Sequence, residues 1–590
     1  MKDKRGFLAA GLIVVALIAF PAFKPPAFLE SFLYLVFFWI ALTSSWQILS
    51  GYTGYFSFGH GAFFGIGMYT TANLATKGEM DFLLTLPIAG IIAAVVGVLI
   101  GAVVFRVKQL RGELFALLTL AVTFVLATIA LNTSIDGGPG VFLSGIKIAN
   151  IYGSPATSLY LFALLTAVAS LALAWWVQHS RFGGGLFAIA DDEDVAEVLG
   201  VPTYRFKLIA LGLSSFIAGV GGGIQAVYVS YVTVPETFSI TVPLFVVLMS
   251  LIGGSRHWLG AAIGAAFITT LNYVFVGGEW ALAGRALIGL ILIVAILYLP
   301  DGLMGLLESR RRKRQSRARA QDTEHVAAGI DRATEHRPAA PAPKPAGASQ
   351  VLLRCEDVQL SFRGVRALAG ISLEVRKGEI LGIVGPNGSG KSTLINTISG
   401  FYRPDAGRIL FRDRDLAKEE AHKIAALGVG RTYQIPRPFV RLSVLENVAL
   451  PAMYGPFGLQ RAAAEAQART ALEHVGLAGR ADALPTELNL HQRKFLEIAR
   501  ALASGSELVL LDEVLAGLTP TEIASAVSMV RSIRDRGATI IFIEHNMRAV
   551  LALTERLIVL DHGEVIAEGE PRDVMRRPAV ITAYLGKAHA

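Results

Sequence analysis

Long apolar runs fill the first half of the chain and stop near residue 300. A membrane-spanning helix needs about 20 consecutive apolar residues, and ten runs approach or reach that length. They lie at 7–23, 30–50, 55–75, 83–105, 113–132, 157–178, 206–230, 240–256, 258–276 and 283–300. The eighth and ninth are short and could be one broken pair. The pattern predicts a polytopic α-helical membrane domain of about ten spans over residues 1–308.

The second half of the chain has a different pattern. The short apolar strand Ile380–Val384 is followed by a glycine-rich loop and a helical stretch, and a further apolar strand, Thr539–Ile543, ends in polar residues. This is typical of a soluble α/β domain, which we place at residues 351–590. The intervening segment, 309–350, is basic and then rich in Pro and Ala. It is too poor in large apolar side chains to fold, so we expect an extended linker.

Composition supports a chain with two kinds of domain. Of 590 residues, 53% are hydrophobic and only 17% are charged, whereas soluble globular chains have about 25% charged residues. The net charge, 54 − 46 = +8, is explained by basic residues that flank membrane spans, and we expect no nucleic-acid partner. The single cysteine, Cys355, excludes an intrachain disulfide and a cysteine-rich zinc site.

Basic residues are concentrated in alternate connections of the ten-span arrangement. With a cytoplasmic N-terminus, the outside connections hold little more than Lys24, Lys77 and Lys147. Basic residues stay on the cytoplasmic side, so we predict this orientation, which also places the C-terminal domain in the cytosol. The first run could instead be a cleaved signal peptide, although no clear small-x-small cleavage site follows it. The inside connections hold Arg106, Lys108, Arg111, Arg181, Arg205, Arg256 and the run 310–314, which could also contact anionic lipid.

Small and polar residues within the apolar runs indicate how the helices pack. Pairs of glycines spaced four apart let helix backbones approach closely, and three such pairs occur: Gly61 and Gly65, Gly219 and Gly223, Gly260 and Gly264. His60 is the clearest ionisable residue inside a run. A membrane-embedded histidine can be functional, and an interhelical hydrogen bond explains it equally well.

The longest inside connection, residues 179–205, contains an amphipathic stretch. Ile189, Val195 and Leu199 recur near helical spacing, acidic residues fill the positions between them, and Gly200 is a stop signal. We expect a short helix outside the membrane that serves as a docking site for a cytoplasmic partner domain. A solvated helix without a partner is the alternative.

A glycine-rich loop in the second half has the spacing of a phosphate-binding loop. It fits G-x-x-x-x-G-K-[ST], follows an apolar strand and precedes a helix. Backbone N–H groups of such a loop surround phosphates, Lys391 neutralises β- and γ-oxygens, and Ser392 can ligate Mg²⁺. We therefore predict an ATP and Mg²⁺ site, with nucleotide-binding residues Gly385, Pro386, Asn387, Gly388, Ser389, Gly390, Lys391, Ser392 and Thr393.

Two further strands end in residues that suit the same chemistry. One is followed by Asp512, which suits Mg²⁺ together with Ser392, and by Glu513, which can polarise an attacking water. The strand at 539–543 leads to His545, so an imidazole would lie at the same sheet edge, where it could reach a γ-phosphate. We predict a catalytic role for the glutamate and the histidine.

These residues, in this order, resemble the nucleotide-binding domain of ATP-binding cassette (ABC) transporters over residues 351–586. The resemblance implies that Phe362 stacks on adenine and that His545 is the switch histidine. It implies that Gln434 is a catalytic and metal-sensing residue that also responds to the membrane domain. Residues 516–519 are similar to the loop that contacts the opposite ATPase. The chain is thus expected to hydrolyse ATP.

The signature segment departs from this family. It covers the ATP of the opposite subunit and reads LSGGQ in most members, whereas residues 488–492 read LNLHQ. Asn489 stands in place of a phosphate-binding serine, and His491 in place of a glycine whose backbone closely approaches the nucleotide. We predict that this segment covers a nucleotide poorly, and that the second ATPase is a distinct chain with an intact signature.

A finer resemblance links both halves to the ABC importers of branched-chain and other hydrophobic amino acids. The ATPase part carries it at 430–434, 444–448, 516–518, 543–547 and 583–586, and the permease part at 51–54, 57–60, 111–112, 199–200 and 299–303. The acidic stretch 191–194 departs from the more basic pattern expected in the coupling loop. The resemblance implies a permease fused to its ATPase, multi-pass in the bacterial inner membrane, with a periplasmic solute-binding protein, a second permease and a second ATPase as partners.

Two other functions fit part of the sequence. An ABC exporter half-transporter also runs from membrane domain to ATPase, but resembles six long helices that reach far into the cytosol. A membrane-tethered P-loop ATPase that moves no solute accounts for the basic tail but not for ten spans. Import of amino acids or related small organic solutes is the function that the sequence favours.

Overall fold

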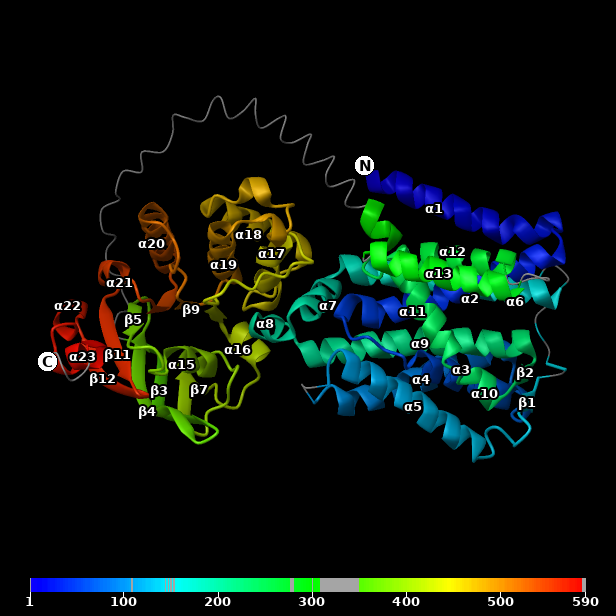
Figure 1. The fold of residues 1–590 in the computed structure, drawn as a ribbon, viewed down its shortest axis with the longest axis horizontal. Coiled ribbons are helices and arrows are strands. Elements are labelled where there is room, and N and C mark those ends of the chain that lie inside the picture. Colours follow the sequence, from blue (N-terminus) through cyan, green and yellow to red (C-terminus); the bar gives the residue numbers. More distant parts are fainter. Residues whose placement is uncertain are drawn as a thin grey trace, which may run out of the picture. The chain divides into compact units, whose positions relative to one another are not determined.

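Each of the ten apolar runs contains a helix in the computed structural model (Figure 1), which describes residues 2–107, 110–143, 145–146, 148, 151, 154–275, 281–299, 301–307 and 350–585. The helices of this half are α1 (Lys2–Ala19), α2 (Ala27–Trp46), α3 (His60–Thr76), α4 (Phe82–Val104), α5 (Glu113–Leu131), α6 (Pro155–His179), α7 (Arg181–Asp191), α8 (Glu193–Val198), α9 (Thr203–Val229), α10 (Val234–Thr237), α11 (Thr241–Gly253), α12 (Gly260–Phe275) and α13 (Ala281–Tyr298). Two short strands, β1 (Val141–Phe142) and β2 (Tyr231–Val232), pair antiparallel.

Six helical segments among the described residues are long and apolar enough to cross a membrane, fewer than the ten predicted spans. The helix α3 falls short because its first turn starts only at His60, which leaves 17 residues, and α12 has 16. The six are Ala27–Gly51, Phe82–Val104, Glu113–Leu131, Pro155–His179, Thr203–Val229 and Val234–Gly253, and Leu8–Phe23 and Gly260–Phe275 are shorter apolar helices.

The chain divides into two compact units. One comprises Met1–Leu186 and Tyr204–Glu335, and the other comprises Phe187–Thr203 and His336–Ala590. The connection between α6 and α9 is therefore divided, and its second part belongs with the α/β half of the chain. The predicted linker lies outside the described residues except for Gln350.

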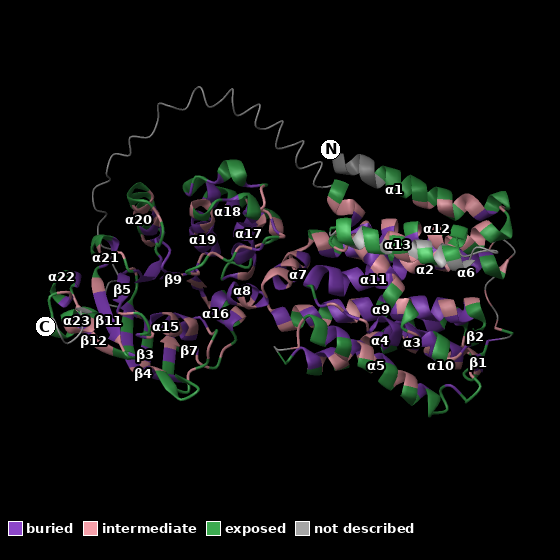
Figure 2. Ribbon diagram, in the orientation of Figure 1, coloured by how far each residue is buried: buried purple, intermediate pink, exposed green. Residues whose placement is uncertain are grey.

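In the first unit, buried residues gather in the interior of the helix bundle (Figure 2), and α2, which packs against α6, α11 and α12, is buried over most of the stretch from Tyr34 to Trp46. It ends in a π-helical turn, Gln47–Gly51, and residues 54–58 have no regular structure. Side chains satisfy this irregular backbone, since the Trp46 indole N–H donates to the Ser57 carbonyl at 2.8 Å and Thr119 Oγ1 accepts the Phe58 N–H at 3.0 Å. Irregular backbone at membrane depth is tolerated where protein buries it in this way.

Gly219, Gly260 and Gly264 mark places where two backbones approach closely, whereas Gly65 makes room for the ring of Phe238. A Cβ at Gly219 would lie 2.7 Å from the Ala89 carbonyl oxygen, and one at Gly264 would overlap the carbonyl of Met249. The spacing therefore reflects helix packing, as the sequence predicted.

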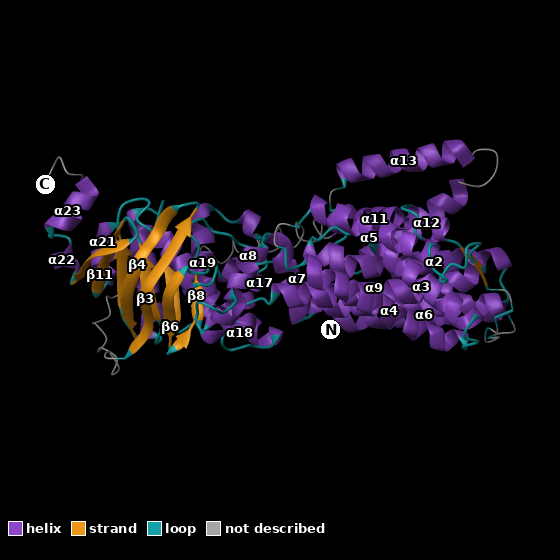
Figure 3. Cartoon of the chain, turned by 90° about the horizontal axis from the view of Figure 1, so that it is seen from below, coloured by secondary structure: helices purple, strands orange, loops and turns teal. Residues whose placement is uncertain are grey.

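The second unit is built on two sheets (Figure 3). The six-stranded sheet has the order β12-β11-β5-β10-β9-β8, and the four-stranded sheet has the order β4-β3-β6-β7. The strands are β3 (Val351–Phe362), β4 (Val365–Arg376), β5 (Ile380–Val384), β6 (Ala406–Phe411), β7 (Arg414–Asp415), β8 (Val429–Arg431), β9 (Leu508–Asp512), β10 (Thr539–Ile543), β11 (Arg556–Asp561) and β12 (Glu564–Gly569).

Helices surround these sheets and shape the ends of the strands. They are α15 (Lys391–Ile398), α16 (Ala421–Leu427), α17 (Val444–Tyr454), α18 (Arg461–His474), α19 (Leu490–Ser504), α20 (Pro520–Asp535), α21 (Met547–Leu553), α22 (Pro571–Val574) and α23 (Pro578–Leu585). The strands β5, β10 and β9 are parallel neighbours with every residue buried. Their carboxyl ends therefore meet at one sheet edge, where ligands bind in open α/β folds.

Candidate active site

The glycine-rich loop connects β5 to α15 and has the backbone that a phosphate cradle requires. Gly385, Gly388 and Gly390 all have positive φ, between +81° and +153°. A Cβ at Gly390 would lie 2.6 Å from the Ala367 carbonyl oxygen, whereas one at Gly388 would meet nothing within 4 Å. Glycine is thus required here for conformation and close approach, and the open position faces free space.

Lys391, the first residue of α15, turns its ammonium group back into this loop. Its Nζ donates to the carbonyl oxygens of Gly385 and Pro386, both at 2.8 Å. Burial lowers the pKa of Lys391, while Glu513 and Asp512 oppose that shift. The ammonium therefore sits among oxygen acceptors that phosphate oxygens can replace. Ser392 and Thr393 follow it in the first turn of the helix.

Asp512, the last residue of β9, fits the predicted magnesium site. Its side chain is only 3% exposed, and Oδ2 lies 3.7 Å from the guanidinium of Arg431 at the end of β8. Its other oxygen, Oδ1, is buried without a hydrogen-bond partner among the described residues. An unsatisfied buried carboxylate oxygen is costly, and burial raises the pKa of this carboxyl. A cation at Oδ1 would remove that cost.

The described residues contain no group of three or more His, Cys, Asp or Glu side chains that could hold a metal alone. Mg²⁺ does not need one, because it keeps several waters and takes further ligands from substrate phosphates. Asp512 and Ser392 together are the kind of sparse ligand set that suits a phosphate-bound Mg²⁺.

Glu513 lies between the two other predicted catalytic side chains. Gln434 Nε2 donates to Glu513 Oε2 at 2.6 Å, and His545 Nε2 lies 2.9 Å from Glu513 Oε1. The glutamate backbone is left-handed, with a φ of +47°, a conformation that costs a non-glycine residue energy and often occurs at functional sites. The structure thus brings together three residues that lie as much as 111 positions apart, as 545 − 434 shows.

Phe362, the proposed adenine-stacking residue, ends β3 with 41% of its surface exposed. Its ring meets Tyr402 at 5.0 Å in an edge-on arrangement, and Phe401 contacts the same tyrosine at 5.0 Å. Sequence reasoning missed these two rings. They follow α15 without any motif, so only the fold reveals that they border Phe362.

A second group that the sequence did not reveal holds the segment after Glu513. Glu544 Oε1 accepts the Leu515 N–H at 2.5 Å, and Lys494 on α19 donates to the Ala516 carbonyl. Burial raises the pKa of Glu544 to about 7 and lowers that of Lys494. The segment predicted to face the opposite ATPase is therefore held from both sides by buried charged residues.

The signature segment begins α19 with a capping box. Asn489 Oδ1 accepts the Gln492 N–H at 2.8 Å, and Gln492 Oε1 accepts the Asn489 N–H at 3.1 Å. His491 packs against Phe495, with ring centroids 4.1 Å apart, and its Nδ1 lies 3.6 Å from Glu522 of α20. Thus Asn489 uses one amide of the first turn for its own helix, and a bulky ring occupies the position of a small residue.

The docking helix predicted in the connection 179–205 is present, and its apolar side chains are buried. It forms the end of α7 and all of α8, and Val195 and Leu199 are 0% and 7% exposed. The helix α8 packs against α16 of the ATPase (Figure 1). Gly200 has a φ of +98°, and a Cβ there would lie 2.5 Å from the Tyr454 carbonyl oxygen. This excludes the alternative of a helix without a partner.

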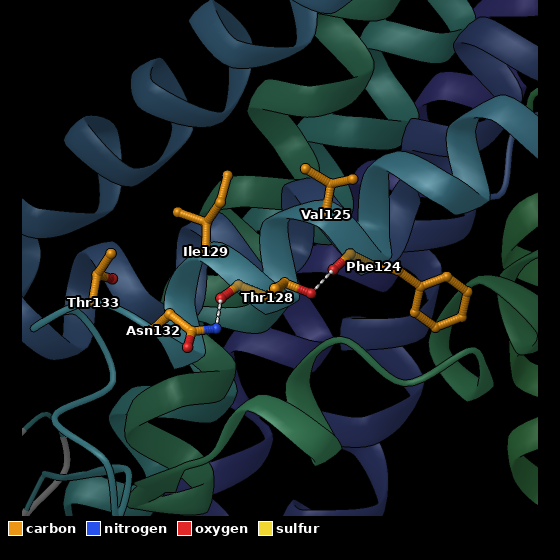
Figure 4. Close-up of a pocket in the computed structure, with 6 residues that line it drawn as sticks. All are labelled: Phe124, Val125, Thr128, Ile129, Asn132 and Thr133. Atoms are coloured by element: carbon orange, nitrogen blue, oxygen red, sulfur yellow. Dashed lines mark hydrogen bonds between the residues drawn. The ribbon is translucent and has the colours of Figure 1, made fainter.

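The membrane unit shows how its own polar residues are used. His60 Nε2 lies 2.7 Å from Ser45 Oγ, which fits the interhelical hydrogen bond that was one of two explanations. An apolar hollow lies on the outward face of α5, lined by Phe124, Val125, Thr128, Ile129, Asn132 and Thr133 (Figure 4). The Thr128 hydroxyl and the Asn132 amide donate to carbonyls of their own helix, at 2.9 and 2.8 Å. The hollow contains no residue of the ATP site.

Comparison with known families agrees with both halves. Residues 28–296 match the permease component of the branched-chain amino acid transport system, and residues 368–516 match the ABC transporter family. Residues 564–590 match the family described as branched-chain amino acid ATP-binding cassette transporter. The chain belongs to the branched-chain amino acid family of ABC transporters. Its permease and its ATPase are fused in one polypeptide.

Individual relatives of this family resemble the ATPase half. The branched-chain amino acid transport ATP-binding protein LivG of Escherichia coli is 36% identical over 254 residues, which cover 41% of this chain and 100% of LivG. A probable LivG of Archaeoglobus fulgidus is 35% identical over 40% of this chain and 95% of its own length. A crystal structure of a nucleotide-free ATP-binding cassette is 32% identical over 40% of this chain and 100% of that chain, with a TM-score of 0.37.

Proposed function

We propose that this chain is the fused permease and ATPase subunit of an importer that takes up branched-chain amino acids or related small organic solutes. The observation that carries the proposal is that one chain combines a branched-chain permease, residues 28–296, with an ATP site in which Glu513 lies against Gln434 and His545. The chain crosses the bacterial inner membrane several times, and we propose ten spans. Its ATPase lies in the cytosol.

ATP binds along the loop from Gly385 to Thr393. Phosphate oxygens replace the loop carbonyls around Lys391, whose ammonium is already at hydrogen-bond distance from two of them. Phe362 and Tyr402 supply an aromatic surface for adenine. Mg²⁺ would be held by Ser392, Gln434 and Asp512, and it neutralises charge that develops on the transferred phosphoryl group.

Glu513 orients the attacking water and accepts its proton. Gln434 and His545 hold the two carboxylate oxygens at 2.6 and 2.9 Å, so the carboxylate is fixed before a water arrives. Since Gln434 belongs to the segment that leads toward α17, a change in that segment would alter the orientation of Glu513. This gives the membrane domain a means of controlling hydrolysis.

The helix α8 transmits movement between the permease and the ATPase. Its apolar residues are buried in the same compact unit as the ATPase, although their chain neighbours belong to the permease. A complete transporter contains a second permease, a second ATPase and a periplasmic solute-binding protein. The capped, histidine-bearing signature of this chain favours a second ATPase that is a distinct chain with an intact signature.

Uptake by right-side-out vesicles, which hold Mg²⁺ and ATP in the lumen with the ATPase and expose the periplasmic face to the solute-binding protein, tests the proposal. Vesicles that contain this chain, its partner subunits and the solute-binding protein should accumulate labelled leucine only with Mg²⁺ and ATP. Replacing Lys391 by Ala should abolish that uptake, because the phosphate cradle loses its only lysine. ATP hydrolysis without uptake of any branched-chain amino acid or related small organic solute would contradict the proposed solute class.

A further inference from the structure

Two consecutive carboxylates lie in the segment Phe187–Thr203, here called the docking loop, and contact two arginines of the ATPase. Arg441 Nε lies 2.8 Å from Asp191 Oδ1, and the Arg441 N–H donates to Asp191 Oδ2 at 2.7 Å. Arg437 Nη1 lies 3.5 Å from Asp192 Oδ2. Both pairs are formed within one compact unit, which contains Phe187–Thr203 together with the ATPase. The acidic stretch that departs from the family pattern thus has a partner surface of opposite charge.

The Asp191 pair is the more buried of the two. The Asp191 side chain is 5% exposed and that of Arg441 is 24% exposed. Each carboxylate oxygen of Asp191 accepts a bond from the same residue, one from its side chain and one from its backbone. A buried charge that loses its partner is strongly destabilising. A loop with a neutral or basic residue at this position would leave Arg441 without that partner.

Arg437 connects the loop to the signature helix α19. Its side chain reaches Asp192, while its backbone is held by two residues of α19: the Arg437 N–H donates to Glu497 at 3.3 Å, and Arg500 donates to the Arg437 carbonyl at 3.1 Å. Glu497 and Arg500 form a buried pair at 2.7 Å. The residue that meets the loop is therefore anchored to the helix that begins with the signature.

Apolar packing alone does not choose between docking loops. Many helices of similar size could place residues such as Val195 and Leu199 in the same groove, because burial of apolar surface is not directional. Opposite charges favour one partner, and like charges exclude others. The loop also offers a fixed geometry, since Asp192 caps α8 by accepting the Val195 N–H at 3.1 Å.

We propose that Asp191 and Asp192 are the residues by which this ATPase selects the permease loop that drives it. The surface formed by Arg437 and Arg441 fits a docking helix that is preceded by two adjacent acidic residues, and it rejects a loop that is basic there. This inference rests on the proposed function, because the selected loop is the one that couples hydrolysis to transport.

Charge exchange on the full chain, assembled with its partners in lipid nanodiscs or vesicles, tests this selection. Asp191→Arg and Arg441→Asp are each expected to lower the ratio of solute uptake to ATP hydrolysis about tenfold. Each is also expected to speed hydrogen exchange of the α8 backbone amides about tenfold. The double variant restores an opposite-charge pair but not the bond from the Arg441 backbone N–H, so both readouts should recover at least about threefold relative to either single variant.

Two further variant sets keep the test decisive. Asp192→Arg with Arg437→Asp exchanges a pair that is 32% and 54% exposed, so it perturbs folding less and should show the same loss and rescue. The exposed pair Arg354 and Glu374, 2.9 Å apart, contacts neither the docking loop nor Arg437 and Arg441 through this ion pair. Exchange of its charges should therefore change neither readout.

The outcomes separate this proposal from the proposed function. Single variants without effect, or double variants as impaired as the single ones, would overturn selection by charge. If the unmodified complex takes up no branched-chain amino acid or related small organic solute, the proposed function fails. Hydrogen exchange of the α8 backbone amides still tests the charge pairs in that case, because this measurement needs no solute.

Discussion

At the scale of residues, the ATP site depends on a few side chains whose positions are set by neighbours far away in sequence. Glu513 adopts a left-handed backbone and receives contacts from Gln434 and His545. Asp512, beside it, keeps one carboxylate oxygen buried without a partner among the described residues. Adjacent acids therefore have different surroundings, which suits different roles in one reaction.

Glu513→Gln should leave binding of Mg²⁺ and ATP largely unchanged and should lower the rate of hydrolysis about 100-fold or more. The amide keeps the shape and the hydrogen bond to Gln434 or His545, but it cannot accept a proton from water. Single-turnover hydrolysis and equilibrium nucleotide binding measure the two effects separately. A variant that hydrolyses ATP at the native rate would show that the base is a different residue.

Glu544 should make stability depend on pH. Burial raises its pKa from an ordinary value of 4.5 to about 7, so the folded state favours the protonated carboxyl. Its contribution to the free energy of unfolding is fully present below about pH 4.5 and is lost as the pH rises through about 7. The loss amounts to about 3 kcal/mol, and Glu544→Gln, which cannot ionise, should remove it.

Thermal unfolding of the ATPase half at pH 5.5 and pH 8, in the full chain, checks this expectation. Glu544→Gln should have a smaller difference between the two midpoints than the unmodified chain. Glu374→Gln is a suitable control because that side chain is 48% exposed, and it should leave the difference unchanged. Equal differences for all three proteins would mean that Glu544 is ionised throughout.

At the scale of elements, the short helix that the amphipathic connection predicts is present as α8, Glu193–Val198. The helix α8 has only six residues, too few for a stable isolated helix. Burial of Val195 and Leu199 and the stop at Gly200 stabilise it within the unit. Burial of the apolar side chains stabilises the docking of α8, and the two acidic residues before it form ion pairs with arginines of the ATPase.

Val195→Ser with Leu199→Ser should separate ATP hydrolysis from transport. Exposing two buried apolar side chains costs about 3 kcal/mol or more, enough to weaken docking of α8, whereas the apolar runs that insert into the membrane are unchanged. Uptake should fall about tenfold or more, while hydrolysis persists. Simultaneous uptake and ATPase assays in vesicles measure this ratio.

The matched control keeps Val195 and replaces Leu199 with an apolar residue of similar size, Leu199→Met. Such a change keeps the buried surface and is tolerated in most cores, so uptake should remain close to that of the unmodified chain. Equal uptake by the serine and the control variants would leave α8 as a connection without a role in coupling.

At the scale of the whole molecule, one chain supplies one permease and one ATPase. The structure places the phosphate loop, Asp512 and Glu513 together at one sheet edge. The signature segment differs, because Asn489 caps its helix and the His491 ring packs on Phe495. In a closed pair of ATPases, each nucleotide lies between the phosphate loop of one subunit and the signature of the other. The two halves of this ATPase are therefore suited to different nucleotide sites.

The purified chain alone should hydrolyse ATP slowly, and addition of a partner ATPase with an intact signature should raise the rate at least about tenfold. The increase should disappear with Lys391→Ala in this chain, because the productive site uses its phosphate loop. As a positive control, Asn489→Ser with His491→Gly should raise hydrolysis by the lone chain. Rapid hydrolysis and coupled uptake by the unmodified lone chain would instead indicate a homodimer.

The placement of the ATP-site residues at one sheet edge was predictable because it depends on local sequence. A phosphate loop needs glycines at set spacings after a strand, and a parallel strand delivers the residue at its end to a common edge, so Lys391, Asp512, Glu513 and His545 could be found without coordinates. Apolar runs predicted helices because the length and hydrophobicity of a segment can be read from that segment alone.

Tertiary structure decided what depends on pairs of distant residues. The irregular backbone at 54–58 shortens α3 because side chains from elsewhere satisfy its N–H groups, and no local pattern announces those partners. Tyr402 borders Phe362, Glu544 holds Leu515, and the two acids before α8 face Arg437 and Arg441. Charge and burial act through space, so a residue whose role is set by its partner becomes recognisable only when the fold brings that partner to it.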